Sequence, residues 1–132
     1  MGAGLLDTSV VVSLQSIQAQ QLPALPVISA VTLAELSVGP LVATGSQERQ
    51  RRQLVLQSAE ATFEPLPFDA ACARRFAQVA GELRNSGSRS RARAFDALIA
   101  ATALVHDLPL FTCNTRDFAG ISNLTVVEVT TP

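Results

Sequence analysis

The fold is decided by one apolar stretch in the second half of the chain, Arg93-Ala94-Phe95-Asp96-Ala97-Leu98-Ile99-Ala100-Ala101-Thr102-Ala103-Leu104-Val105. From Ala97 onward almost every residue is apolar or small, and Ala and Leu favour helix, so this stretch predicts a helix that is buried on all sides. It is too short to cross a bilayer, which needs about 20 residues. Asp96 stands at the head of the predicted helix. It is either a helix-capping residue or a metal-binding carboxylate held at the edge of the core.

Short apolar runs alternate with predicted helices along the rest of the chain. The candidate strands are residues 4–6, 27–28, 62–66, 109–113 and 125–129. The other predicted helices cover residues 10–20, which Thr8 or Ser9 can cap, a segment from Ser29 that weakens at Gly39-Pro40, residues 47–59, and a segment that Asp69 caps. Such alternation predicts an α/β sandwich with a parallel sheet of about five strands and helices on both faces. With 132 residues, 48% of them hydrophobic, we expect residues 1–132 to form one domain.

The composition excludes several classes of function. The net charge of −1 argues against a uniformly basic nucleic-acid-binding protein. All ten basic residues are arginine, which excludes P-loop enzymes and makes receiver domains and haloacid-type phosphatases unlikely candidates, since each uses a lysine. Cys72 and Cys113 match no metal-binding spacing, so we expect them to pack as small hydrophobes. The segment before Asp7 does not resemble a signal peptide, which favours a cytoplasmic protein without a membrane segment.

Four acidic residues fall near the ends of the predicted strands. Asp7 follows the first strand, Glu35 lies in the helix after the second, Asp96 opens the buried helix, and Asp117 lies just past residues 109–113. Because ligands gather at the carboxyl ends of parallel strands, these carboxylates can converge there. Mg²⁺ and Mn²⁺ take such oxygen ligands and can activate a water for phosphodiester cleavage. The alternative is four separate caps and surface acids, and spacing alone does not decide between the two.

Four motifs in the sequence occur in the same order in one family. They are Leu5-Leu6-Asp7-Thr8-Ser9, Ser29-Ala30-Val31-Thr32-Leu33-Ala34-Glu35-Leu36 with Gly39, Phe95-Asp96-Ala97-Leu98-Ile99-Ala100-Ala101-Thr102-Ala103, and Thr112-Cys113-Asn114-Thr115-Arg116-Asp117-Phe118. Through them the chain resembles a PIN-domain ribonuclease of the VapC toxin type, from residue 5 to about residue 129. The resemblance implies a three-layer α/β/α sandwich. It also implies Mg²⁺- or Mn²⁺-dependent endonucleolytic cleavage of structured RNA, such as transfer or ribosomal RNA.

The resemblance assigns roles to individual residues. Asp7 and Asp96 would be the principal metal ligands, and Glu35 and Asp117 would complete the site directly or through water. Supporting hydrogen bonds would come from Thr8, Thr112 and Asn114, with a helix cap as the alternative for Thr8. The resemblance further implies a homodimer that a VapB-type antitoxin holds inactive.

Several arginines are candidates for contacts with the RNA backbone. Those near the predicted acidic site are Arg89, Arg91, Arg93 and Arg116. Residues 89–93 could equally form a solvated loop, and a second arginine cluster at residues 49–52 better suits a solvated helix face. The alternative function is a PIN-like module that binds RNA or protein without cutting. Four retained acids argue against it, because a silent domain has no reason to keep a repulsive cluster.

Overall fold

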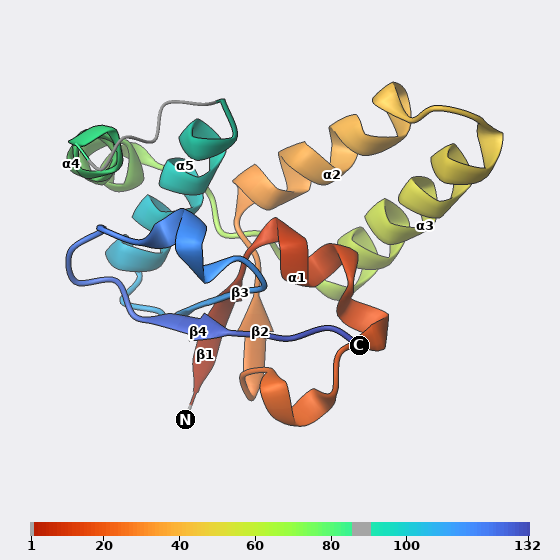
Figure 1. Ribbon diagram of the computed structural model, residues 1–132, viewed down its shortest axis with the longest axis horizontal. Helices are drawn as coiled ribbons and strands as arrows, with labels where there is room; N and C mark the ends of the chain where they lie inside the picture. The colour runs from red at the N-terminus through yellow and green to blue at the C-terminus, as the bar shows by residue number, and fades with distance from the viewer. Residues whose placement is uncertain (1, 86–90) are drawn as a thin grey trace.

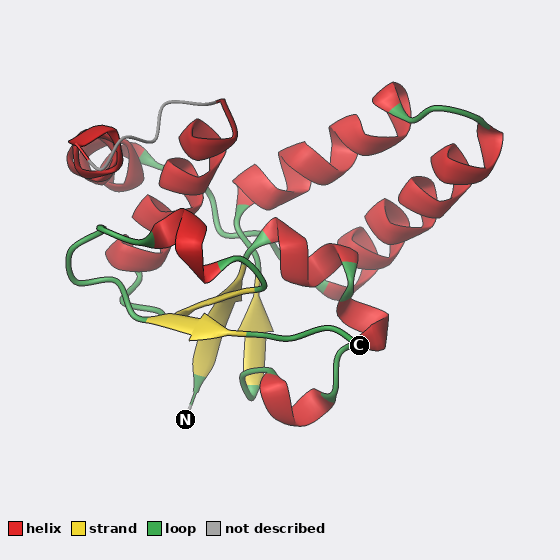
Figure 2. Cartoon of the chain, viewed as in Figure 1, coloured by secondary structure: helices red, strands yellow, loops and turns green. Residues whose placement is uncertain are grey.

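The computed structural model describes residues 2–85 and 91–132 (Figures 1 and 2). The RNA contact predicted for Arg89 and the side chain of Arg91 lie outside the described part. In chain order the elements are β1 (Ala3–Leu6), α1 (Thr8–Val12), the 3₁₀ turns η1 (Leu14–Ser16) and η2 (Ala19–Gln21), β2 (Leu25–Val27), α2 (Ala30–Val42), α3 (Ser46–Thr62), α4 (Ala70–Asn85), α5 (Arg91–Val105), β3 (Leu110–Thr112), the 3₁₀ turn η3 (Thr115–Phe118) and β4 (Val126–Glu128).

The strands form one parallel sheet in the order β2-β1-β3-β4. Leu5 of the central strand β1 lies beside Val27 on one side and Leu110 on the other. Because successive side chains of a strand point to opposite faces, Leu5 and Leu6 enter different cores. Leu5 packs with residues of α4, α5 and η3, whereas Leu6 packs with residues of α1, α2 and α3. The sheet is therefore covered on both faces, which confirms the predicted α/β sandwich.

The predicted buried helix is the centre of the first core. Residues of α5 that are at most 1% exposed include Ala97, Ile99, Ala100, Ala101 and Ala103. Small side chains let α4 and the sheet approach this helix closely. The helices α2 and α3 instead form a hairpin whose far end extends away from the sheet (Figure 1). None of the helices in the described residues is both long and apolar enough to cross a membrane.

The described sheet has four strands, so the prediction of about five was too high. The predicted strand at residues 62–66 does not form, because α3 continues to Thr62. Only Leu66 pairs, in an isolated bridge beside Ser29, where its N–H donates to the carbonyl of Ile28 at 2.9 Å. Pro65 has no N–H, and a strand cannot extend its ladder through such a residue.

Three predicted helix boundaries were also wrong. The first helix ends at Val12 instead of residue 20, consistent with its run of β-branched valines, and Asp7 caps it instead of Thr8 or Ser9. The second passes through Pro40 to Val42. The helix α5 begins at Arg91, so Asp96 lies in its second turn and is not a capping residue. Asp96 therefore has no capping role that would explain an acid at this half-buried position.

Candidate metal centre

Asp7 lies at the carboxyl end of the central strand β1, where both its backbone and its carboxylate are held by hydrogen bonds. Its backbone N–H donates to the carbonyl of Phe111 at 3.0 Å, which extends the β1–β3 pairing by one residue. Its Oδ2 accepts from the Thr112 hydroxyl at 2.6 Å. Its Oδ1 accepts from the Ser9 hydroxyl at 2.6 Å and from the backbone N–H of Val10 at 3.2 Å. With 5% exposure, Asp7 is a rigid carboxylate at the edge of the core.

Glu35 reaches the same region from α2. The Thr8 hydroxyl donates to Glu35 Oε1 at 2.5 Å, which joins the helix that follows β1 to the helix that follows β2. Thr8 Oγ1 also lies 3.1 Å from the hydroxyl oxygen of buried Thr32. The supporting hydrogen bonds predicted for Thr8 and Thr112 are thus present, and each orients a different acid.

Asp96 and Asp117 form the other side of the site. The helix α5 supplies Asp96, and η3, which follows β3, supplies Asp117. The guanidinium of Arg93 bridges them: Nη1 lies 2.5 Å from Asp96 Oδ2, and Nη2 lies 2.9 Å from Asp117 Oδ1. Arg93 was predicted to contact RNA, but in this structure its guanidinium is turned towards the two acids.

Electrostatic interactions link the acids to one another. The pKa of Asp96 is raised to about 6, chiefly by burial; the charges of Asp117 and Asp7 contribute to the rise, and Arg93 opposes it. Burial also raises the pKa of Glu35; the Thr8 hydrogen bond opposes this rise, and the charge of Asp7 adds to it. The pKa of Asp7 itself is raised by burial against its hydrogen bonds. The charge of Asp7 thus acts on an acid from each half of the site, Glu35 and Asp96.

The donor set suits a hard divalent cation, because carboxylate oxygens are the ligands that Mg²⁺ and Mn²⁺ prefer. Burial is the main cause of the raised pKa values, and an added positive charge would relieve the repulsion between carboxylates that contributes to them. In the arrangement seen here, however, no three acidic, histidine or cysteine side chains of the described residues lie close enough to hold one ion. Asp96 and Asp117 each give one oxygen to Arg93 instead.

Sequence reasoning missed one supporting residue, Ser9. Its hydroxyl donates to Asp7 Oδ1 and accepts from the backbone N–H of Cys113 at 3.1 Å, so it joins the ends of β1 and β3. Ser9 stands in the first motif but was considered only as a helix cap. Asn114 contributes its backbone N–H, which donates to Thr112 Oγ1 at 2.9 Å, and its side chain is exposed.

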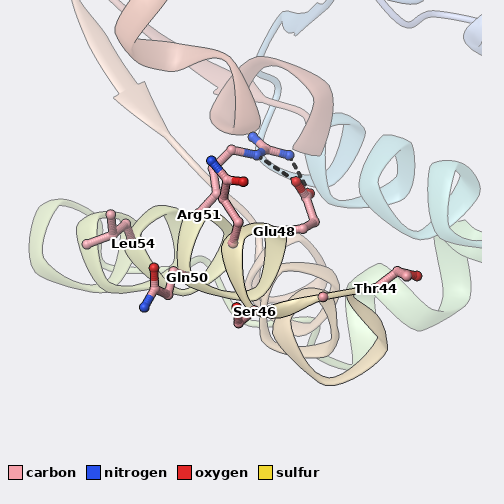
Figure 3. Close-up of a pocket in the computed structure, with 8 residues that line it drawn as sticks. Thr44, Ser46, Glu48, Gln50, Arg51 and Leu54 are labelled. Atoms are coloured by element: carbon pink, nitrogen blue, oxygen red, sulfur yellow. Dashed lines mark hydrogen bonds and ion pairs between the residues drawn. The ribbon is translucent and has the colours of Figure 1, made fainter.

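The second arginine cluster lies on α3. Glu48 pairs there with Arg51 Nη2 at 2.6 Å and with Arg52 Nε at 2.7 Å, and Arg52 Nη1 donates to the carbonyl of Gly39 at 2.9 Å. Figure 3 shows the Arg51–Glu48 pair at a pocket lined by residues 44–54, to which none of the four acids contributes. These ion pairs fit the solvated helix face that was favoured for this cluster, and the Arg52 hydrogen bond joins α3 to α2.

The shifted pKa of Asp96 predicts how stability depends on pH when metal is removed with EDTA. Because the folded state holds this proton up to about pH 6 and the unfolded chain loses it near 3.8, ionisation of Asp96 opposes folding. The protonated Asp96 carboxyl contributes fully to stability below the pKa of the unfolded chain, and this contribution is lost as the pH rises through the pKa of the folded state. We expect Asp96→Asn to unfold at a higher temperature than wild type at about pH 7.5, and at a similar temperature at about pH 4.

Thermal unfolding followed by circular dichroism at both pH values tests this expectation. Glu60→Gln is the matched control, because it removes an exposed carboxylate from α3. It should show no pH-dependent difference from wild type. An Asp96→Asn protein that becomes less stable than wild type towards neutral pH would contradict the prediction.

Comparison with known proteins identifies the class first. The PIN-domain family model matches residues 4–124, so the chain belongs to the PIN-domain family. Ribonuclease VapC5 from Mycobacterium tuberculosis is 38% identical over 130 residues, covering 96% of this chain and 93% of that protein. A tRNA(fMet)-specific endonuclease VapC from Shigella flexneri is 35% identical over 97 residues, covering 74% of this chain and 70% of that protein. Within the PIN-domain family, the chain therefore belongs to the VapC ribonucleases.

The comparison of folds agrees. The crystal structure of VapBC-5, a member of the VapBC family of toxin–antitoxin systems from Mycobacterium tuberculosis, matches with a TM-score of 0.82 and 34% identity. The match covers 98% of this chain and 100% of that one. The resemblance predicted from the four sequence motifs is confirmed.

Proposed function

We propose that this chain is the toxin of a VapBC-type toxin–antitoxin module and a divalent-metal-dependent endoribonuclease. The observation that carries the proposal is that acids from four separate elements are linked: the Asp7 charge acts on Glu35 and Asp96, and Arg93 bridges Asp96 and Asp117. Holding buried carboxylates together costs stability, and a protein that only bound RNA would gain nothing from that cost. The non-cutting module is therefore the weaker candidate.

Each side chain has a distinct task in this proposal. Asp7 and Asp96 are the principal ligands, and Glu35 and Asp117 complete the site directly or through water. Thr112 and Ser9 fix the orientation of the Asp7 carboxylate, and Thr8 fixes that of Glu35. A bound ion, Mg²⁺ or alternatively Mn²⁺, would supply activation of a water and stabilisation of the leaving oxygen of the phosphodiester.

The proposed substrate is a structured RNA, with transfer RNA favoured over ribosomal RNA. The specificity of the Shigella flexneri relative for tRNA(fMet) supports this choice. Arg116 is exposed in η3 next to Asp117, where a phosphate contact would place the RNA backbone at the acids. We assign the same role to Arg89 and Arg91. The chain contains no Tyr or Trp, so shape and phosphate contacts are expected to outweigh base stacking.

The proposed partner is a cognate VapB-type antitoxin, as in the VapBC-5 complex. A basic side chain of the antitoxin entering the acidic region would inhibit by charge complementarity. We also propose that residues 1–132 form a single PIN domain, that the toxin is a homodimer, and that it acts in the cytoplasm, where its RNA substrates are.

The proposal predicts that cleavage depends on a divalent ion. Purified protein freed of antitoxin is expected to cut total cellular RNA into discrete fragments with Mg²⁺ or Mn²⁺. EDTA should abolish cleavage, and added Mn²⁺ should restore it, because the carboxylates alone offer no positive charge to the leaving oxygen. Gel analysis with end-sequencing of the fragments measures the effect and identifies the target. RNA binding that persists in EDTA, with no cleavage at any metal concentration, would favour the non-cutting module.

A further inference from the structure

Arg93 is the one described side chain whose guanidinium bridges two of the four acids. Arg93 and Asp96 are three residues apart on α5, which places them on the same face of the helix. Asp117 comes from η3, so the bridge joins two elements that are distant in sequence. The side chain of Arg93 is 27% exposed, that of Asp96 19% and that of Asp117 28%. Solvent therefore screens the contact less than it would screen a surface ion pair.

We propose that Arg93 is a positioning residue that occupies the place of the divalent cation between Asp96 and Asp117 and withdraws when the ion binds. The inference rests on the proposed metal site. In the absence of metal, the guanidinium neutralises the repulsion between the two carboxylates, which the Asp7 charge would otherwise increase. Arginine does not lose its proton in proteins, so movement of the side chain, not deprotonation, must clear the site.

Two observations support this role. Each of the two terminal nitrogens of Arg93 contacts a different carboxylate, which is the bridging that a shared cation would provide. In addition, the Asp96 and Asp117 side chains are only 19% and 28% exposed, so the guanidinium lies between two carboxylates that are largely withdrawn from solvent. The competing arrangement keeps Arg93 in place while the ion binds the other oxygens, Asp96 Oδ1 and Asp117 Oδ2. The two arrangements predict opposite effects of removing Arg93.

The test is the affinity of the metal-free full-length protein for Mn²⁺, measured by isothermal titration calorimetry without RNA. If Arg93 competes with the ion, Arg93→Gln should bind Mn²⁺ at least about five-fold more tightly than wild type, the lower end of typical coupling between two ligands. Arg49→Gln is the control, because it removes the same charge from an exposed side chain on α3 that has no role in the proposed site. Its Mn²⁺ affinity should stay within about two-fold of wild type, well below such coupling.

Arg93→Lys provides a second variant in case Arg93→Gln does not fold. A single ammonium cannot contact both carboxylates through separate nitrogens, so the Lys variant should have an Mn²⁺ affinity between those of wild type and Arg93→Gln. Mn²⁺ binding that is unchanged or weaker in both Arg93 variants, with normal binding by wild type, would overturn the inference and leave the metal site intact. Absence of Mn²⁺ binding in wild type and both variants would overturn the metal site as well.

Discussion

Asp96→Asn is expected to lower the rate of RNA cleavage at saturating Mg²⁺ by at least about 100-fold. Loss of a residue that only hydrogen-bonds to a metal ligand already lowers metal affinity or activity by about 10–100-fold, and Asp96 is proposed to be a ligand itself. Asn keeps the shape of the side chain but loses the charge that binds the ion. The protein should remain folded, since burial already disfavours the charged carboxylate at this position. The rate of cleavage of a labelled target RNA, beside a circular dichroism spectrum, measures both effects.

Asp107→Asn is a matched control for this substitution. Asp107 follows α5, is exposed, and has a φ of 53°, a left-handed conformation that Asn also tolerates. It should cut RNA at the wild-type rate. Wild-type cleavage by folded Asp96→Asn would show that Asp96 is not a ligand and that the catalytic site lies elsewhere.

Asp7→Glu is expected to lower cleavage by about 100-fold although it preserves the charge, because displacement of a reacting group by about 1 Å can cost that much. The Asp7 carboxylate is 5% exposed and fixed on both oxygens by Ser9, Val10 and Thr112. An extra methylene has no room there, and overpacking should also lower the free energy of unfolding by about 1–3 kcal/mol. Cleavage kinetics and chemical denaturation measure the two effects.

Asp117→Glu makes the same chemical change at a less restricted acid. Its side chain is 28% exposed on a 3₁₀ turn, so a longer carboxylate can adjust its position. We expect a smaller loss of both cleavage and stability than at Asp7. Equal effects at the two positions, or near-wild-type cleavage by Asp7→Glu, would contradict the conclusion that Asp7 is the fixed ligand of the site.

The sequence was most informative where burial controls local structure. The run from Ala97 to Val105 predicts the buried helix because no polar residue except Thr102 interrupts it, and the short apolar runs that end at Leu6 and Thr112 mark the two central strands. Three of the four acids follow or lie within these elements, and Glu35 lies in α2, after β2. Their spacing alone did not decide whether they act together, and their roles came from the family resemblance.

Other features depend on contacts between elements and could not be read from the sequence. The run of residues 62–66 has strand-like composition, but the sheet edge is extended there by Leu66 alone. Arg93 belongs to an arginine-rich stretch that suggests a solvated or RNA-binding segment. Its contact with Asp117 depends on how α5 packs against η3. The role of Ser9 likewise depends on the adjacent end of β3, through the N–H of Cys113.

The central claim is that acids from both halves of the site act on one ion. The most direct test is the Mn²⁺ concentration that gives half-maximal RNA cleavage by Glu35→Gln, since Glu35 enters from α2, opposite Asp96 and Asp117. Gln keeps the oxygen that accepts from the Thr8 hydroxyl but loses the charge. We predict that Glu35→Gln needs an Mn²⁺ concentration about 10–100-fold higher than wild type for half-maximal cleavage. The control Glu60→Gln should need the same concentration as wild type. A wild-type Mn²⁺ requirement in Glu35→Gln would contradict a single shared site.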